Sequence, residues 1–243
     1  MLEAHDIWAR YYDYVYERTY GHFYERFTNM TLGVIQETIG AGTIIDFGAG
    51  TGRFSLPLKE KGYEIIAVEK SAGMTEVLRT KANSRNLDFP IYNCAIADYM
   101  NGDCDLALAL FSVLSYATTE DELKKNIHNI CSHIRPNGYF FFDLPKSAFF
   151  NADMLIDINQ LDFVRRVTVL PQENNSLHTY HEQCQGIFER KPFRYEEAFS
   201  IRFWERKFVA NLLEAEGLLP VKIDLSAFNG TGATYLLFQK TKF

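Results

Sequence analysis

Apolar residues along the chain gather in short runs that alternate with amphipathic stretches. The runs predict five strands, at residues 44–47, 63–68, 90–95, 106–110 and 138–144. The amphipathic stretches predict helices at residues 53–61, 72–83 and 120–134, the last with Thr118 or Thr119 as its N-terminal cap. Strands that alternate with helices in this way predict an α/β fold with a doubly wound, mostly parallel sheet.

The end of the chain predicts how this sheet is completed. Residues 206–216 are expected to form a helix closed by Gly217, and residues 218–228 and 233–240 two further strands. The Gly-rich connection at residues 229–232 is too short for anything but an antiparallel hairpin. The predicted sheet is therefore seven-stranded and Rossmann-like, and it ends in an antiparallel hairpin.

Residues 146–204 predict an insertion of a different kind. Alternating apolar and polar residues at 161–170, 176–188 and 193–203 indicate an added antiparallel β meander. This meander is either a cap over a substrate cleft or a covering or dimerising sheet. Its polar and aromatic residues include His178, Tyr180, His181, Glu182, Gln183, Tyr195 and Arg202. His178 and His181 would face opposite sides of one strand, so we expect no metal site there.

A stripe of tyrosines marks the N-terminal segment. Tyr12, Tyr16, Tyr20 and Tyr24 recur every four residues, which places them along one face of a helix that Gly21 is expected to interrupt. The stripe either anchors this helix to the core or belongs to a lid whose hydroxyls reach a ligand.

A glycine-rich loop carries the clearest candidate chemistry. Residues 44–52 (IIDFGAGTG) predict a buried strand, an Asp-x-Gly-x-Gly-x-Gly turn and then a helix whose free N–H groups face the loop. Glu69 ends the next predicted strand, where a carboxylate commonly binds both ribose hydroxyls of a nucleoside. A ribose of NAD could bind to the Glu69 carboxylate equally well. However, Arg53 stands where the dinucleotide pattern G-x-G-x-x-G has its third glycine, and Asp46 is placed to bind a cationic amino group.

These residues resemble the first motifs of class I S-adenosylmethionine-dependent methyltransferases. The similarity continues in order through AVEKSAGM (67–74), AIADY (95–99), CDLALALFS (104–112) and IRPNGYFFFD (134–143), and it covers about residues 40–145. The segment YDYVY (12–16) also resembles the Tyr-Asp-x-x-Tyr entry segment of small-molecule N-methyltransferases, including the amino-sugar N,N-dimethyltransferases. The resemblance implies S-adenosylmethionine as cofactor, S-adenosylhomocysteine as product and a small-molecule acceptor.

The resemblance also implies roles for individual residues. Asp46 and Gly48 would meet the amino acid end of the cofactor, and Glu69 the ribose. Met74 would pack on the adenine, and Asp98 with its neighbours would recognise the adenine edge. The cofactor-binding residues expected in this way are Tyr12, Tyr20, Asp46, Gly48, Ala49, Gly50, Gly52, Glu69, Lys70, Met74, Ala97, Asp98, Tyr99 and Phe111.

Methyl transfer itself asks for few catalytic groups. A sulfonium methyl chiefly needs a nucleophile held about 3–3.5 Å away and aligned with it. A neutral amine acceptor needs no strong base, whereas an alcohol would need one such as His181 or Glu182. Residues 111–116 (FSVLSY) stand where family enzymes acting on macromolecules often carry Asn/Asp-Pro-Pro-Tyr, which favours a small acceptor. Candidates for a direct catalytic role are Tyr12, Tyr116 and His181.

Composition narrows the remaining possibilities. A net charge of −6 argues against a nucleic acid substrate, because phosphate backbones are bound by Lys and Arg. No apolar run approaches the roughly 20 residues of a membrane span, and the chain does not begin with a secretory pattern. The four cysteines, Cys94, Cys104, Cys131 and Cys184, lack the spacing of a metal site. We therefore expect a cytoplasmic protein without a metal, and the many aromatic residues leave a homodimer open.

The sequence thus predicts a methyltransferase that transfers a methyl group from S-adenosylmethionine to a small molecule, with N-methylation slightly favoured over O-methylation. One alternative is a catalytically silent cofactor-binding or regulatory protein, and a second is an NAD-dependent oxidoreductase. We expect one methyltransferase domain over residues 1–243. Its parts would be an N-terminal helical lid (1–40), a cofactor-binding core (41–145), an inserted cap (146–204), and a terminal helix and hairpin (205–243).

Overall fold

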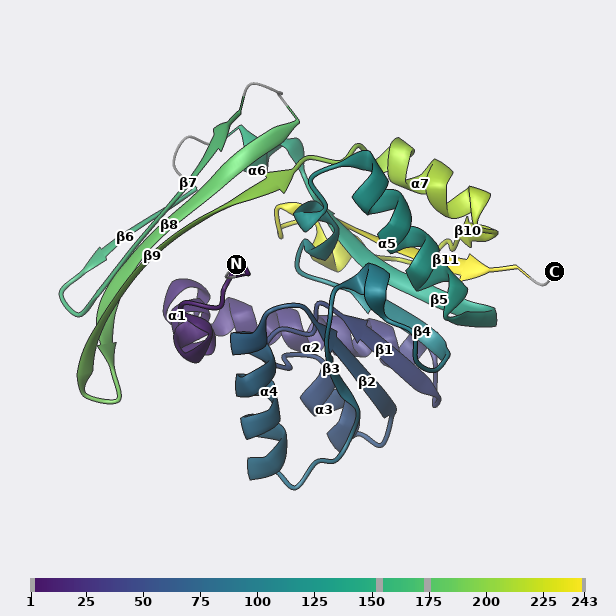
Figure 1. Cartoon of the computed structure of the whole chain (residues 1–243), viewed down its shortest axis with the longest axis horizontal. Coiled ribbons are helices and arrows are strands. Elements are labelled where there is room, and N and C mark those ends of the chain that lie inside the picture. Colours follow the sequence, from purple (N-terminus) through teal and green to yellow (C-terminus); the bar gives the residue numbers. More distant parts are fainter. Residues whose placement is uncertain (1–2, 152–154, 173–175, 242–243) are drawn as a thin grey trace.

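A seven-stranded sheet forms the core of the computed structural model, which describes residues 3–151, 155–172 and 176–241. The strand order is β10-β11-β5-β4-β1-β2-β3 (Figure 1). Five strands are parallel to one another, whereas β11 runs antiparallel to both β5 and β10. The predicted doubly wound sheet with an antiparallel end is therefore confirmed. The strands are β1 (Thr43–Phe47), β2 (Glu64–Glu69), β3 (Ile91–Asn93), β4 (Cys104–Ala109), β5 (Ile134–Pro145), β10 (Leu218–Pro220) and β11 (Ala233–Lys240).

Helices cover both faces of this sheet (Figure 1). One face carries α2 (His22–Thr38), α3 (Ser55–Glu60) and α4 (Ala72–Ser84), and the other carries α5 (Glu120–Ser132) and α7 (Arg206–Ala215). Apolar side chains of β1, β4 and β5 point into both layers, which explains the unbroken apolar runs in these strands. Short 3-10 turns η2 (Ile96–Asp98), η3 (Val113–Tyr116) and η4 (Ser226–Phe228) lie in the connections.

Thr119 decides where α5 begins. Its hydroxyl accepts the N–H of Glu122, and the Glu122 carboxylate accepts the N–H of Thr119 in return. This capping box satisfies two donors that a helix start otherwise leaves free. Of the two threonines predicted as caps, Thr119 therefore fills the position.

The terminal hairpin is less regular than predicted. Its first strand is β10 alone, and its pairing with β11 ends with the bond from the Val221 N–H to the Leu237 carbonyl. The chain then returns through η4 to β11. The antiparallel direction was predicted correctly, but the length of the first strand was wrong.

The insertion forms a separate four-stranded antiparallel sheet, here called the cap sheet. Its strands are β6 (Ile156–Gln160), β7 (Phe163–Pro171), β8 (Leu177–Phe188) and β9 (Lys191–Arg202), in that spatial order. A short helix, α6 (Ser147–Phe150), leads from β5 toward it. The meander was predicted with three strands, and β6 was missed. Figure 1 shows the cap sheet curving past the N-terminal segment.

The N-terminal segment lies between the cap sheet and the core (Figure 1). It consists of η1 (Ala9–Tyr11) and α1 (Tyr12–Tyr20), and Gly21 separates α1 from α2 with a φ of +52°. Trp8 is fully buried and stacks on Tyr195 of β9, with ring centroids 4.8 Å apart. The predicted interruption of the tyrosine stripe at Gly21 is confirmed.

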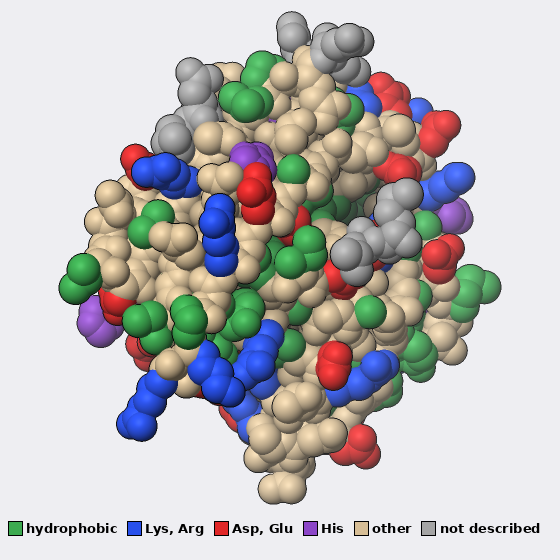
Figure 2. Space-filling model, turned by 60° about the vertical axis from the view of Figure 1, so that its left-hand side comes forward, with side chains coloured by type: hydrophobic (Ala, Val, Ile, Leu, Met, Phe, Trp, Pro, Cys, Tyr) green, Lys and Arg blue, Asp and Glu red, His purple; other side chains and the backbone are tan. Residues whose placement is uncertain are grey.

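The molecular surface carries both signs of charge. On the face in Figure 2, Lys and Arg side chains gather in the lower part, next to hydrophobic side chains, and acidic side chains are spread over the rest. Within residues 3–151, 155–172 and 176–241, no helix has the length and apolar character needed to cross a membrane.

Candidate functional site

The glycine-rich loop lies where β1 ends, at the edge reached by all the parallel strands. Gly50 and Gly52 have φ values of +56° and +86°, which L side chains rarely adopt. A Cβ on Gly52 would lie 2.3 Å from a methyl group of Leu78, so packing requires this glycine. A Cβ on Gly50 would meet nothing within 4 Å, so the loop is open to a ligand at that point.

Glu69 joins this loop to the start of α4. One carboxylate oxygen accepts the N–H of Gly50 and the other accepts the N–H of Ser71, both at 2.8 Å. Burial raises the pKa of Glu69, and these backbone donors oppose the rise. Each oxygen has a further lone pair, so two ligand hydroxyls can donate to the same carboxylate.

Asp46 lies beneath the loop and is almost fully buried. Its carboxylate accepts the hydroxyl proton of Ser55 at 2.5 Å. Burial raises the pKa of Asp46 to about 7, and the nearby charge of Glu69 adds to the rise. A cation placed beside Asp46 would stabilise its ionised form, so the site favours a positively charged ligand group.

The residues predicted to meet an adenine divide into two groups. Met74 is buried at the start of α4, and Ala97 and Asp98 belong to η2, with Asp98 exposed. The Tyr99 side chain is not brought to this edge, because its ring is buried in the core and packs against Phe47 with centroids 5.7 Å apart. Tyr99 therefore contributes to packing through its ring.

The N-terminal segment lies directly over the start of α4. Asp6 accepts hydrogen bonds from the Ser71 hydroxyl at 2.6 Å and from the Gly73 N–H at 3.0 Å. A Cβ on Gly73 would lie 2.9 Å from the Asp6 carbonyl oxygen, which shows how closely the two segments approach. Lys70 forms an ion pair with Glu3 at 2.6 Å.

Helix α1 contacts both the glycine-rich loop and the cap sheet. Asp13 accepts the Thr51 hydroxyl at 2.7 Å and pairs with Lys81 at 2.9 Å. On the other side, the indole N–H of Trp8 donates to Glu197 of β9 at 2.9 Å. The segment therefore bridges the loop and the cap.

A strained turn follows β4. Phe111 and Ser112 have φ values of +74° and +66°, which cost roughly 1–3 kcal/mol each in residues other than glycine. Asp143 at the end of β5 holds this turn, because its carboxylate accepts the N–H of Phe111 at 2.5 Å and that of Ser112 at 3.1 Å. Burial raises the pKa of Asp143 to about 6, and these donors oppose the rise.

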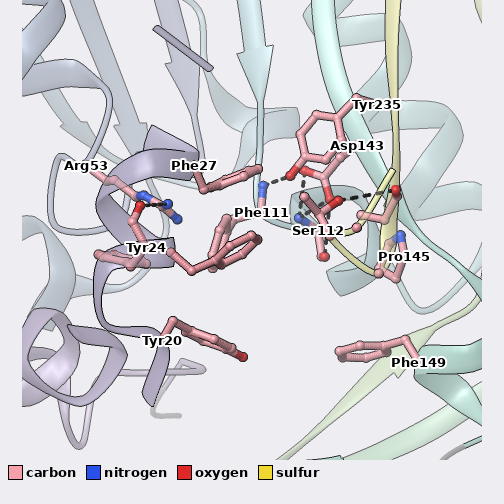
Figure 3. A pocket seen from close by; sticks show the side chains of 15 residues that line it. Tyr20, Tyr24, Phe27, Arg53, Phe111, Ser112, Asp143, Pro145, Phe149 and Tyr235 are labelled. Carbon is pink, nitrogen blue, oxygen red and sulfur yellow. Dashed lines mark hydrogen bonds between the residues drawn. The ribbon is translucent and has the colours of Figure 1, made fainter. Parts of the chain in front are cut away.

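A cavity of about 250 Å³ opens beside this turn (Figure 3). Its walls come from α1, α2, the turn after β4, the end of β5 and the loop before β11. The polar side chains in the lining are few and include Arg53 and Asp143. The aromatic side chains in the lining are Tyr20, Phe23, Tyr24, Phe27, Phe111, Phe149 and Tyr235.

Two of the three candidates for a catalytic role, Tyr12 and Tyr116, pack against the ring of His5, and the third lies elsewhere. Tyr12 is stacked on Trp8 in the N-terminal segment, with centroids 5.1 Å apart. The Tyr116 hydroxyl lies 2.6 Å from Nε2 of His5. His181 lies on the outer face of the cap sheet, 2.8 Å from Glu196, because alternation along β8 turns it away from its inward-facing neighbours. The structure therefore does not bring His181 to the cavity.

Glu182 is the other base considered for an alcohol acceptor, and its carboxylate is already bound to neighbouring side chains. It forms a fully buried ion pair with Arg165 at 2.9 Å. It also accepts hydrogen bonds from the hydroxyls of Tyr180 at 3.0 Å and Tyr195 at 2.5 Å. This network fixes β7, β8 and β9 to one another, and Arg165 also donates to Thr19 of α1 at 2.9 Å.

Several residues at the site had no role assigned from the sequence. Arg53 was noticed only as a departure from the dinucleotide pattern, and Asp143 only as the end of a motif. Asp13 was noticed only as part of the YDYVY segment and Tyr24 only as part of the tyrosine stripe, and Asp6 carried no signal. In the segments that the structure describes, no cluster of three or more His, Cys, Asp or Glu side chains could hold a metal ion.

Comparison with known proteins agrees with this geometry. Residues 44–138 match a family model described as a methyltransferase domain. The provisional methyltransferase YqeM of Bacillus subtilis (strain 168) is 24% identical over 194 residues, which cover 77% of each sequence.

Solved structures share the fold over nearly the whole chain. A S-adenosylmethionine-dependent methyltransferase from Clostridium acetobutylicum ATCC 824 has a TM-score of 0.80 at 16% identity, over 96% of this chain and 99% of that one. The sugar N-methyltransferase KedS8 from Streptoalloteichus sp ATCC 53650 has a TM-score of 0.73 at 14% identity, over 100% and 94%. Residues 44–138 therefore match a methyltransferase domain, and the chain shares its fold with S-adenosylmethionine-dependent methyltransferases, as predicted.

Proposed function

We propose that the protein transfers a methyl group from S-adenosylmethionine to a nitrogen atom of a small molecule. The observation that carries this proposal is the placement of Glu69, whose carboxylate bridges Gly50 of the open loop and Ser71 at the start of α4. Each oxygen has a lone pair left to accept a ribose hydroxyl. When bound, the cofactor supplies a methyl group that its sulfonium already activates.

The residues around Glu69 fit the rest of this cofactor. The Asp46 carboxyl has a raised pKa because it is buried, and a cationic amino group beside it would stabilise its ionised form. Gly50 has no side chain, so the loop is unobstructed at that point. Met74, which is buried at the start of α4, would pack on the adenine, with Ala97 and Asp98 at the adenine edge. S-adenosylhomocysteine is then the product.

The cavity beside Phe111 is the proposed acceptor site. Its walls are mostly aromatic, so they offer an apolar surface on which an acceptor can pack. Among the described residues of its lining, Asp143 is the one carboxylate, and it is occupied in holding the turn. An amine acceptor, which reacts as the neutral base, suits a cavity without a free general base. The shared fold with a sugar N-methyltransferase supports the same choice of nitrogen.

The first test is calorimetric titration with S-adenosylmethionine, S-adenosylhomocysteine and, separately, NADH. We expect micromolar binding of the first two and none of NADH. Binding of NADH alone would instead establish a dinucleotide enzyme.

The second test is transfer of a labelled methyl group to paired acceptors, amino sugars against the same sugars with a hydroxyl in place of the amine. We expect label on the amines. Label on hydroxyls alone would contradict N-methylation, and cofactor binding without transfer across a broad panel would favour a silent or regulatory protein.

A further inference from the structure

Arg53 lies at one end of the aromatic cavity, and it forms no ion pair with any carboxylate in the described part of the chain. Its guanidinium is stacked between rings, 3.8 Å from the ring centre of Tyr24 and 4.4 Å from that of Phe111. Nε donates to the Thr28 hydroxyl at 2.8 Å, and Nη2 donates to the Tyr24 carbonyl at 3.1 Å. These are neutral acceptors, so they satisfy two donors without balancing the charge.

Two polar atoms at this end remain unused. Arg53 Nη1 and the Tyr24 hydroxyl are both buried, and neither has a hydrogen-bond partner in the described part of the chain. Asp143 lines the opposite side of the cavity, but its oxygens accept the two backbone donors of the turn (Figure 3). Burial lowers the pKa of Arg53, which is the expected effect when a cation lacks a nearby anion.

Burying an unpaired cation with a free N–H costs free energy unless a ligand supplies the missing acceptor and the opposite charge. We propose that this end of the cavity binds a carboxylate group, held by Arg53 Nη1 and the Tyr24 hydroxyl. Two donors match the two oxygens of a carboxylate, and the stacked rings keep the guanidinium plane fixed toward it.

The carboxylate has two chemical sources, and this inference rests on the proposed function. One is the amino acid end of S-adenosylmethionine, and the other is an acceptor that carries a carboxylate besides its amine. The lining favours the acceptor, because it includes Pro145, Phe149 and Tyr235 at the β5–β11 side and does not include Glu69 or Gly50.

The test uses the full chain with Arg53→Gln and Tyr24→Phe, and Arg10→Gln as the matched control. Arg10 is an exposed arginine paired with Glu189 on the surface, so its change removes the same charge far from the cavity. Calorimetry with 5′-methylthioadenosine, which lacks the amino acid end, verifies that each variant keeps its nucleoside site. Phenylacetate is the carboxylate probe, added to protein loaded with S-adenosylhomocysteine, and phenylacetamide is its neutral counterpart.

An acceptor carboxylate predicts that phenylacetate binds and phenylacetamide does not. Arg53→Gln then lowers the affinity for phenylacetate by about 10- to 100-fold, and Tyr24→Phe lowers it by about three- to tenfold. The affinity of Arg10→Gln does not change. A cofactor carboxylate predicts the same losses for S-adenosylmethionine but none for 5′-methylthioadenosine, and no phenylacetate binding. Both results support the site and identify its source.

The proposal is overturned if Arg53→Gln binds 5′-methylthioadenosine normally and changes neither S-adenosylmethionine nor phenylacetate by more than twofold. Failure of the proposed function has a different signature, since wild-type protein would then bind neither nucleoside. In that case, phenylacetate binding to the unloaded protein and its loss in Arg53→Gln still decide the carboxylate site.

Discussion

Glu69→Gln is the sharpest single test of the nucleoside site. The change keeps the size of the side chain but replaces one carboxylate oxygen with an NH₂ group. Because Gly50 and Ser71 both present N–H donors at 2.8 Å, the new NH₂ must face one of them in either orientation. The variant therefore loses one hydrogen bond within the protein and one acceptor for the ribose.

The expected loss of affinity follows from the bonds that disappear. A hydrogen bond to a charged acceptor contributes about 1.5–3 kcal/mol, which corresponds to an affinity for S-adenosylmethionine lower by about 10- to 100-fold. The lost clamp between the loop and α4 lowers the free energy of unfolding by about 1–2 kcal/mol in addition. Measuring binding at a temperature well below the unfolding transition separates the loss of affinity from the loss of stability.

Calorimetric titration at one pH and salt concentration measures the change. Glu76→Gln is the matched control, because Glu76 is exposed on α4 and its loss removes the same charge without touching the loop. We expect the control to bind within twofold of wild type. A folded Glu69→Gln protein with wild-type affinity would rule out this role for Glu69, since the carboxylate would then not contact the cofactor.

Two further predictions concern the other buried carboxylates. Asp143→Ala should lower the free energy of unfolding by about 2–4 kcal/mol near pH 4, where a folded pKa of about 6 keeps the wild-type carboxyl protonated, because the N–H groups of Phe111 and Ser112 lose their acceptor; urea unfolding within 0.5 kcal/mol of wild type would contradict this. Asp46 has a pKa of about 7 in the folded protein, against a usual 3.8, so the folded protein holds this proton more tightly than the unfolded chain does. Ionisation of Asp46 therefore opposes folding as pH rises from about 4 to 7. Asp46→Asn should therefore gain stability relative to wild type by up to about 4 kcal/mol across that range, and an unfolding free-energy difference that does not change with pH would exclude the raised pKa.

The sheet could be predicted because its signals are local. Each parallel strand contains a short apolar run, the loop glycines follow strand β1 directly, and Glu69 ends strand β2. Strand β6 escaped prediction because it is too short and exposed to show a clear pattern: Ile156 and Ile158 are only partly buried and the residues between and after them are exposed. Its position is set by pairing with β7, which is a tertiary effect.

The cavity could not be predicted because its residues meet only in the folded chain. Arg53 reaches Tyr24 and Thr28 of α2 from the turn before α3, and Asp143 reaches the turn after β4 from the end of β5. Neither contact has a spacing or a composition that marks it in the sequence. The ring of Tyr99 gives the reverse case, in which a motif position that resembles a binding residue belongs to the core.

The N-terminal segment is held more strongly by its contacts with the cap sheet than by its contacts with the core. Toward the cap sheet it buries Trp8 against Tyr195 and receives a hydrogen bond from Arg165, whose ion pair with Glu182 is fully buried. Toward the core, the ion pairs Asp13–Lys81 and Glu3–Lys70 are partly solvent-exposed, and exposed pairs contribute only about 0–1 kcal/mol each. Burial of aromatic rings contributes several times more. The weaker seam therefore lies between α1 and the glycine-rich loop, which is the side on which Gly50 is open to a ligand.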